Sequence, residues 1–523
     1  MVAPRWRRLL LSAGPLLAIL GVAALLRFYR LELDGLWYDT ANSITTASNP
    51  TLREVVKATK AEIQFPLYFL ILHFWLKVNG SEFWVRTLSV LLGLGTVAMV
   101  YVTGKVFFSK RVGLLAAALT AVSSYQLYYS RYPRSYILLA LLTMASVYLL
   151  RQAFVGRRLH WWIGYTLITL MALYTHPYAF ALVLGQWLFA GVNILRGDRW
   201  AAFPWLASQL ALLAGLAPWL PTIFAHYQAQ EDGIDAWIPR VDLMELVRLL
   251  DWLWFHTKGD YGPWLDRALY YSRDLLSLVV LFGLFLGGHL REKALLTLAV
   301  LVPIASIYLI SAFVQPIWVP RYFVFISGPF CILVAYALWA LWERCRQLGK
   351  APMAIGVSLG LALLVFTSAL PIWSLFNDNV FRNADVRAAA SWIRSQYQDG
   401  DLIVHTNYQS YLPSVWYNRR AGLAENRPLQ YQIFRAWESM PEAWCLAAPY
   451  NETYVSLDYL DLRLVDDAQR VWLTILYNHR SSDESAQELE RLLQQAAGRV
   501  PSTYDLRSRQ DFLGLTVLLY EKP

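Results

Sequence analysis

Charged residues are scarce in this sequence. Only 16% of its 523 residues are Asp, Glu, Lys or Arg, whereas 57% are hydrophobic. Soluble domains carry about 25% charged residues, so a soluble globular protein with a large core is excluded. The hydrophobic residues instead form long blocks, which is typical of a polytopic membrane protein.

Cysteine is scarcer still. The chain has three, of which Cys331 and Cys345 lie in or beside one apolar block and Cys445 stands alone near the C-terminal end. These positions have neither the spacing of a metal site nor an obvious disulfide framework. The sequence also contains no internal repeat of fixed short period and no low-complexity segment, so a repeat architecture is not predicted.

Acidic residues are outnumbered by basic ones, and the net charge is +9. The Lys and Arg residues stand in short clusters between apolar blocks, which indicates membrane topology and not nucleic-acid binding. We therefore expect membrane lipid, and no nucleic acid, among the partners.

We predict a polytopic α-helical membrane protein with about eleven transmembrane helices, because each apolar block provides roughly the 20 residues that cross a bilayer. The first block follows Arg5, Arg7 and Arg8 and lacks a convincing small-residue cleavage site, so it reads as a signal anchor that is kept. The predicted spans are approximately 9–26, 83–104, 112–130, 136–154, 161–176, 178–195, 203–224, 274–290, 294–313, 322–343 and 351–373.

The basic clusters test this count. With the N-terminus inside, every predicted inner loop is basic, as the positive-inside rule requires, and an odd number of spans places the C-terminus outside. The inner clusters are Arg5/Arg7/Arg8, Lys105/Lys110/Arg111, Arg151/Arg157/Arg158, Arg196/Arg199, Arg291/Lys293 and Arg344/Arg346/Lys350.

Three outer segments are long. The first, about 27–82, contains the apolar piece Pro66–Leu76, which is too short to span. The second, about 225–273, contains Val241–Phe255, where apolar residues recur at helical spacing. Both pieces are predicted to be interfacial helices in outer loops.

The third outer segment is a tail of soluble composition. We predict a transmembrane domain over residues 1–373 and an outer-face soluble α/β domain over residues 374–523, because helix and strand patterns alternate in the tail. The elements expected in the tail are an amphipathic helix at Asp385–Gln396, a turn at 399–401, and strands at Leu402–Val404 and Phe512–Tyr520.

The most informative stretch is Leu33–Thr40, in which Asp34 and Asp39 stand where the chain leaves the first span. Asp39 has two interpretations. It is a preferred residue for the N-cap of a helix formed by the residues that follow. It is also ionised at neutral pH, with an unperturbed pKa of ~3.9, so it is able to take a proton from a hydroxyl as a general base.

Three arginines depart from the positive-inside trend on the predicted outer face. Arg131 and Arg134 lie in the turn between the third and fourth spans, and Arg321 precedes the tenth. In the structural interpretation they snorkel or anchor an aromatic belt, since Tyr and Trp crowd around them. In the functional interpretation they clamp a phosphate, because a guanidinium offers paired donors that match its geometry. Their occurrence together opposite an acid-bearing loop favours the clamp.

Two histidines stand near these groups in the sequence. His176 is a candidate at the outer end of the fifth span, although a lone His at a helix end is more often structural. His73 lies within the apolar piece Pro66–Leu76 and is read as structural.

Short motifs follow one another in a recognisable order along most of the first 345 residues. They are Trp37-Tyr38-Asp39, Phe65-Pro66-Leu67-Tyr68-Phe69, His73-Phe74-Trp75-Leu76, Ser81-Glu82-Phe83-Trp84-Val85-Arg86, Tyr129-Ser130 with Arg134-Ser135-Tyr136, Tyr174-Thr175-His176, Trp237-Ile238-Pro239 and Pro320-Arg321-Tyr322. In this order and spacing they resemble the integral-membrane glycosyltransferases with the C-type superfold. That class includes the protein O-mannosyltransferases and the lipid A aminoarabinose transferase, and the likeness is greatest to its bacterial mannosyltransferase-like group.

The resemblance implies a donor in which a sugar hangs from a polyprenyl phosphate. Asp39 matches the aspartate that acts as the family's base, and attack on the anomeric carbon with polyprenyl phosphate leaving would invert the configuration. Arg134 and Arg321 match the family's arginines and are expected to bind the donor phosphate, with Arg131 as a further candidate. The residues expected to support the site are Asp34, Gln64, Tyr68, Tyr136, His176 and Tyr322.

The chain departs from the family at three places. Thr40 stands where the family usually has Glu, Gln64-Phe65 stand where it often has His-Pro, and Tyr132 stands where it usually has an acid. Because hard cations prefer carboxylates, we expect no divalent metal and no other cofactor. Arg131 could replace the lost group by its charge.

We therefore predict an inverting enzyme that transfers one hexosyl or pentosyl unit to a glycolipid, polysaccharide or protein acceptor. It would lie in a bacterial inner membrane, with the N-terminus cytoplasmic and the C-terminal domain periplasmic. One alternative is a transporter or flippase of lipid-linked sugar, although ionisable residues are scarce inside the spans and paired broken helices are lacking. The other is a non-catalytic member of the same fold, which the missing acids suggest.

Overall fold

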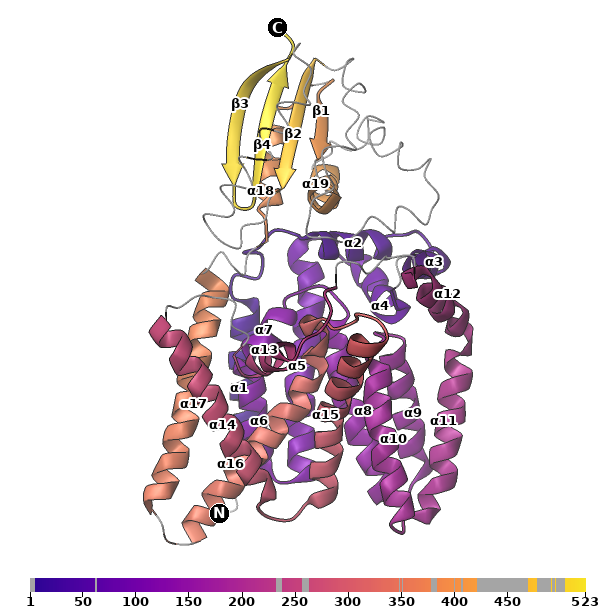
Figure 1. Ribbon diagram of the computed structural model, residues 1–523, viewed down its shortest axis with the longest axis vertical. Coiled ribbons are helices and arrows are strands. Elements are labelled where there is room, and N and C mark those ends of the chain that lie inside the picture. Colours follow the sequence, from indigo (N-terminus) through magenta and orange to yellow (C-terminus); the bar gives the residue numbers. More distant parts are fainter. Residues whose placement is uncertain are drawn as a thin grey trace. The chain divides into compact units, whose positions relative to one another are not determined.

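The computed structural model describes residues 5–61, 64–231, 238–255, 263–347, 349, 351–377, 383–398, 400–405, 408–420, 469–476, 491, 494 and 504–523. The chain divides into two compact units, whose elements Figure 1 labels. The helical unit comprises Met1–Leu31, Pro50–Ala225 and Ile238–Asn377, and the sheet unit comprises Glu32–Asn49, His226–Trp237 and Asp378–Pro523. The predicted boundary at residue 374 stays a prediction, and Cys445 lies outside the described residues.

Helices make up the helical unit. Its elements are α1 (Arg5–Phe28), α3 (Leu52–Ala61), α4 (Pro66–Leu76), α5 (Glu82–Phe107), α6 (Lys110–Val122), α7 (Ser124–Tyr129), α8 (Tyr136–Gly156), α9 (Leu159–Leu173), α10 (Ala179–Leu195), η1 (Arg199–Ala201), α11 (Ala202–Leu216), η2 (Ala217–Trp219), the beginning of α12 (Leu220–Glu231), α13 (Met244–Trp254), α14 (Pro263–Phe285), α15 (Leu290–Phe313), η3 (Pro320–Ile326), α16 (Ser327–Gln347) and α17 (Ala351–Asn377).

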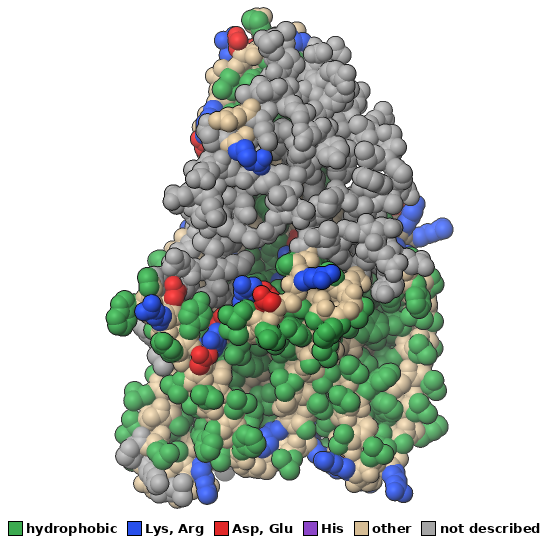
Figure 2. Space-filling view, in the orientation of Figure 1, with side chains coloured by type: hydrophobic (Ala, Val, Ile, Leu, Met, Phe, Trp, Pro, Cys, Tyr) green, Lys and Arg blue, Asp and Glu red, His purple; other side chains and the backbone are tan. Residues whose placement is uncertain are grey.

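Many of these helices are apolar enough to lie in a bilayer. Within the described residues, six helical stretches have the length and composition to cross a membrane, and each of the eleven predicted spans overlaps a helix. Figure 2 shows hydrophobic side chains over the visible face of the helical unit and Lys and Arg side chains at its lower edge. The prediction of a polytopic helical membrane protein is confirmed. The six stretches are Glu82–Phe107, Tyr136–Gly156, Arg199–Ala225, Pro263–Phe285, Leu290–Phe313 and Pro320–Gln347.

The basic loops between these helices meet at one end of the unit. Arg151 at the end of α8 forms an ion pair with Glu292 of α15 at 3.0 Å, and Arg291 pairs with Asp198 at 3.0 Å. The opposite end of α8 is Tyr136, and a helix of its 21 residues is about 31 Å long. Loops at the Tyr136 end are therefore separated from the basic end by about the thickness of the hydrocarbon core.

The predicted span 112–130 is not one continuous helix. Ser123 adopts an extended conformation after α6, and its side chain accepts a hydrogen bond from the backbone N–H of Gln126 at 3.4 Å. Serine is a preferred N-cap, and this bond begins the short helix α7. The chain therefore changes direction just before the turn that carries Arg131 and Arg134.

The two predicted interfacial pieces are both helical. Helix α4 has the predicted bounds Pro66–Leu76, with proline in its first turn, where a missing N–H costs nothing. Helix α13 occupies Met244–Trp254 of the predicted stretch. Their position at the membrane surface stays a prediction.

Within the described residues, the sheet unit contains four strands, three whole helices and the end of α12. The sheet has the order β1-β2-β4-β3, with β1 parallel to β2 and the other pairs antiparallel. Its elements are α2 (Tyr38–Ala47), α18 (Val386–Gln396), β1 (Leu402–His405), α19 (Tyr408–Arg420), β2 (Arg470–Leu476), β3 (Asp505–Phe512) and β4 (Leu515–Glu521).

The predicted helix and strands of the tail are found, with one correction. Asp385 caps α18 by accepting from the N–H of Ala388 at 3.0 Å, and the apolar face of α18 packs on the sheet around Trp472. The strand predicted at Phe512–Tyr520 is instead the end of β3, a turn and then β4. Gly514 has φ +72°, a left-handed conformation that glycine adopts without strain, and this allows the reversal.

Candidate functional site

Asp39 lies in the first turn of α2, within the sheet unit. Trp37 and not Asp39 is the N-cap, and the backbone N–H groups of Thr40 and Ala41 both donate to the Trp37 carbonyl. The capping interpretation of Asp39 is therefore wrong. The Asp39 side chain is half-buried and lies at the N-terminal end of α2.

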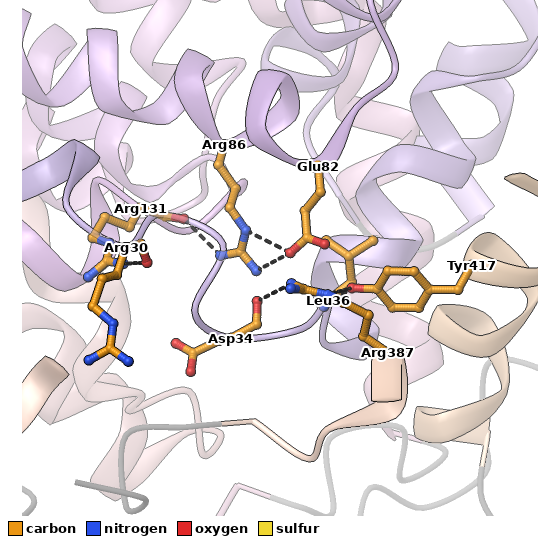
Figure 3. A network of polar contacts seen from close by, with 8 residues as sticks. All are labelled: Arg30, Asp34, Leu36, Glu82, Arg86, Arg131, Arg387 and Tyr417. Carbon is orange, nitrogen blue, oxygen red and sulfur yellow. Dashed lines mark hydrogen bonds and ion pairs between the residues drawn. The ribbon is translucent and has the colours of Figure 1, made fainter. Parts of the chain in front are cut away.

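Asp34 lies in the loop that leads into α2. Its backbone carbonyl accepts a hydrogen bond from Arg387 of α18 at 3.1 Å (Figure 3). Both candidate acids of the predicted first outer loop belong to the sheet unit.

A second group of predicted residues gathers in the helical unit around His176. Helix α9 ends at Leu173, earlier than the predicted span, so His176 lies in the loop before α10. The imidazole is buried, and its ring centroid is 4.7 Å from that of Tyr322 and 6.0 Å from that of Tyr136. The Tyr136 and Tyr322 rings are themselves 5.5 Å apart. The start of α8, the loop before α10 and η3, which are distant in sequence, therefore meet at one aromatic cluster.

Both predicted phosphate-binding arginines act on this imidazole. Burial, and then the positive charges of Arg134 and Arg321, lower the pKa of His176 to about 3. His176 is consequently neutral at physiological pH. Its Nδ1 accepts a hydrogen bond from the backbone N–H of Tyr178 at 3.2 Å, so the ring proton is assigned to Nε2.

Gln64 and Tyr68 lie on the Arg134 side of this group. Arg134 donates from an Nη to the side-chain oxygen of Gln64 at 3.2 Å. Tyr68 of α4 is fully buried, and its hydroxyl lies 3.4 Å from that of Ser89. Burial raises the pKa of the Tyr68 phenol, so the group stays protonated, although the Arg134 charge opposes this shift. Arg134 therefore contacts Gln64, and its charge acts on Tyr68; that these two residues support a site stays a prediction.

The backbone before Arg321 is held by two tyrosines that were not among the predicted site residues. The hydroxyl of Tyr125 donates to the Pro320 carbonyl at 2.5 Å, and the hydroxyl of Tyr178 donates to the Ile317 carbonyl at 2.5 Å. The N–H of Val319 donates back to Tyr178 at 3.2 Å. These bonds fix the chain on both sides of Val319 and so position Arg321. The motif Tyr174-Thr175-His176, which ends two residues before Tyr178, was the nearest sequence signal for this role.

Arg131 makes contacts of a different kind. An Nη donates to the carbonyl of Arg30 at 2.6 Å, and the guanidinium lies over the ring of Phe376 at 4.7 Å. Its own carbonyl accepts from Arg86, which forms a buried ion pair with Glu82 at 3.0 Å (Figure 3). These contacts link the residues just after α1 with α5 and α17, so the structural interpretation suits Arg131 better than the phosphate clamp.

Metal binding was not expected from the sequence. Among the described residues, no three His, Cys, Asp or Glu side chains come together closely enough to hold a metal ion. The expectation that the protein needs no metal stays a prediction.

Comparisons with known proteins agree with this architecture. Residues 63–222 match the family model described as dolichyl-phosphate-mannose-protein mannosyltransferase, whereas a comparison with curated proteins found no match. The structure of ArnT from Cupriavidus metallidurans in the apo state is similar, with a TM-score of 0.61 and 13% identity over 97% of this chain and 98% of that chain. For the same protein bound to undecaprenyl phosphate the TM-score is 0.59, with 12% identity and the same coverage. At such identities the likeness is one of fold, and with the family model it confirms the predicted resemblance to C-type membrane glycosyltransferases.

Proposed function

We propose that this chain, which has the fold of C-type membrane glycosyltransferases, moves a single sugar from a polyprenyl-phosphate carrier to an acceptor on the outer face of the membrane. The fold and the mannosyltransferase family model support the reaction class. A protein of similar fold has been solved with undecaprenyl phosphate, which supports the class of carrier.

The observation that carries the proposal concerns the buried, neutral His176. The positive charges of Arg134, which precedes it in the sequence, and of Arg321, which follows it, both act on this imidazole. The leaving group of the proposed reaction is a phosphate that gains negative charge as the glycosidic bond breaks. Preorganised cationic donors stabilise such a charge in the transition state more than in the ground state. Two guanidinium groups whose charges act on one buried ring would provide these donors.

His176 would contribute a neutral donor to the same phosphate. Because its Nδ1 is used by Tyr178, the Nε2–H is the group left to donate. The depressed pKa keeps the imidazole from carrying a third positive charge, which the two arginines would oppose.

Asp39 is assigned the general base. The acceptor hydroxyl would give its proton to the Asp39 carboxylate while its oxygen forms a bond to the anomeric carbon. The bond from that carbon to the phosphate oxygen breaks, and the electron pair leaves with the polyprenyl phosphate. Attack from the side opposite the phosphate inverts the anomeric configuration.

The topology completes the proposal. The Arg134, His176 and Arg321 loops lie at the end of the helical unit that carries Tyr136, away from the basic loops. Because basic loops face the cytoplasm, the site would face outward, and about eleven spans would place the tail there too. We propose a bacterial inner membrane, with a glycolipid, polysaccharide or protein as acceptor.

The test is a mass comparison of cell-envelope glycolipids and glycans from a deletion strain restored with different forms of the gene. Wild type is expected to restore one lost sugar mass, and Asp39→Asn is expected to lower its accumulation by about 10²-fold or more, since amide nitrogen and oxygen accept no proton at neutral pH. Glu54→Gln is the matched control, because Glu54 is an exposed acid on the neighbouring helix α3.

Each outcome decides something. If deletion removes no sugar, the transferase proposal is wrong. If Asp39→Asn restores the sugar as fully as wild type does, Asp39 is not the base, and a transporter or a non-catalytic subunit explains the defect better. Equal amounts of wild-type and variant protein in the membrane must be shown by immunoblot.

A further inference from the structure

The segment that carries Asp39 is built into the sheet unit, although more than 300 residues of sequence separate it from Asp378–Pro523, the largest part of that unit. Residues 32–49 and Asp378–Pro523 form one compact body together. Helix α2, which contains Asp39, packs against α19. The buried residues of α2 include Thr40, Ala41 and Ile44.

Two side chains of the sheet unit bind the backbone just before α2. The backbone N–H of Leu36 donates to the hydroxyl oxygen of Tyr417 at 2.9 Å, and Nε of Arg387 donates to the same oxygen at 3.3 Å (Figure 3). An Nη of Arg387 donates to the carbonyl of Asp34 at 3.1 Å. Leu36 is fully buried, so its N–H needs an acceptor from the protein, and Tyr417 provides it.

The side chain that follows this clamp is anchored as well. Trp37 packs against the apolar core formed by α18 and the sheet, next to residues such as Val386 and Trp472. The Trp37 carbonyl then accepts from Thr40 and Ala41 and begins α2. The start of the helix is therefore fixed two residues before Asp39 by contacts from α18 and α19.

We infer that Tyr417 and Arg387 are positioning residues, which hold residues 34–37 so that Asp39 keeps the orientation required for proton abstraction. This inference rests on the proposed function. It gives the sheet unit a direct part in the chemistry, because α18 and α19 of that unit hold the segment that carries the general base in place. A base displaced by about 1 Å loses about 10²-fold in rate, so a two-bond clamp has a measurable effect.

The first measurement is amide hydrogen exchange of the full-length protein, with Tyr417→Phe as the variant. The phenylalanine ring keeps the packing of α19 but removes the oxygen that accepts from Leu36. Exchange in the peptide that covers residues 33–40 is expected to rise about fivefold, the equivalent of one net hydrogen bond. Tyr411→Phe is the matched control, since Tyr411 lies on the same helix with its ring against His405.

The second measurement separates positioning from substrate binding. In the deletion strain, Tyr417→Phe is expected to slow accumulation of the restored sugar by about tenfold or more, while binding of undecaprenyl phosphate to the purified protein stays at the wild-type value. A merely structural role would lower the thermal stability and the binding together. Arg387→Met is expected to give the same pattern, and Arg387→Lys is expected to recover part of the rate because one donor is kept.

The results distinguish this inference from the proposed function. If Asp39→Asn abolishes restoration while Tyr417→Phe restores at the wild-type rate, the proposed function stands and the clamp is overturned. If exchange at 33–40 does not change in Tyr417→Phe, or if undecaprenyl phosphate binding falls along with the rate, the clamp is overturned as well. If Asp39→Asn restores fully, the base assignment fails and the clamp has no catalytic part, whatever the exchange shows.

Discussion

The imidazole of His176 packs against the phenol ring of Tyr322, with the ring centroids 4.7 Å apart. This contact joins the loop before α10 to the beginning of η3. Arg134 arrives from a third loop, and its charge and that of Arg321 both act on the same imidazole. An anion that reached this ring would therefore find positive charge from two separate parts of the chain, which is the arrangement that phosphate recognition uses.

Replacing either arginine should weaken carrier binding. Arg134→Gln and Arg321→Gln are each expected to raise the dissociation constant for undecaprenyl phosphate by about 10- to 100-fold, because each removes charge-assisted hydrogen bonds. Titration of the purified protein with undecaprenyl phosphate measures the effect. Arg53→Gln, at an exposed position on α3, is the control and should bind as wild type does. Wild-type affinity in both site variants would contradict the phosphate clamp.

Hydropathy alone was enough to predict a span over each long apolar helix of the helical unit, but it predicted neither α3 nor the break between α6 and α7. The short piece Pro66–Leu76 and the capped helix that starts after Asp385 also followed from local sequence. Strand β3 did not, because its residues Asp505–Phe512 are mostly polar and exposed and form an edge of the sheet. A strand of this kind has neither the alternation nor the apolar run by which strands are recognised.

The candidate site was only partly predictable for a related reason. Arg131 and Arg134 stand in one turn, and nothing local distinguishes the residue that binds the Arg30 carbonyl from the one that reaches Gln64. Tyr178 and Tyr417 act through partners far away in the sequence. Contacts of this kind depend on the tertiary fold. A short residue pattern does not specify which distant residue each side chain will contact.

Gly93 of α5 permits the close approach of the turn that leads to Arg131. A Cβ at this position would lie 2.5 Å from Cβ of Ser130 and 3.2 Å from Nε of the buried Arg27. Gly93→Ala is therefore expected to destabilise the protein by about 1–3 kcal/mol through overpacking. Thermal unfolding in detergent measures this, with Gly21→Ala as the control because no atom lies within 4 Å of its added Cβ. Equal melting temperatures for the two variants would show that α5 can move away at little cost.

His405 at the end of β1 should make the stability of the sheet unit depend on pH. Its imidazole is buried, Nδ1 lies 3.1 Å from the hydroxyl of Ser410, and Nε2 has no hydrogen-bond partner among the residues that the structure describes. Burial lowers the pKa of His405 to about 3 from its ordinary 6.5. The native state therefore binds this proton less readily than the unfolded chain does.

The sign of the pH effect follows from that difference. The contribution of a neutral His405 to stability is fully present above pH 6.5 and is lost progressively as the pH falls from 6.5 towards 3. In this range the imidazole binds a proton in the unfolded chain but not in the folded protein. At pH 5.5 the loss is about 1.4 kcal/mol. Thermal unfolding at pH 7.5 and 5.5 tests this: His405→Gln should remove the histidine's share of the pH dependence, whereas His160→Gln, at an exposed position, should leave it. An unchanged pH dependence in His405→Gln would mean that His405 is protonated as readily in the folded protein as in the unfolded chain.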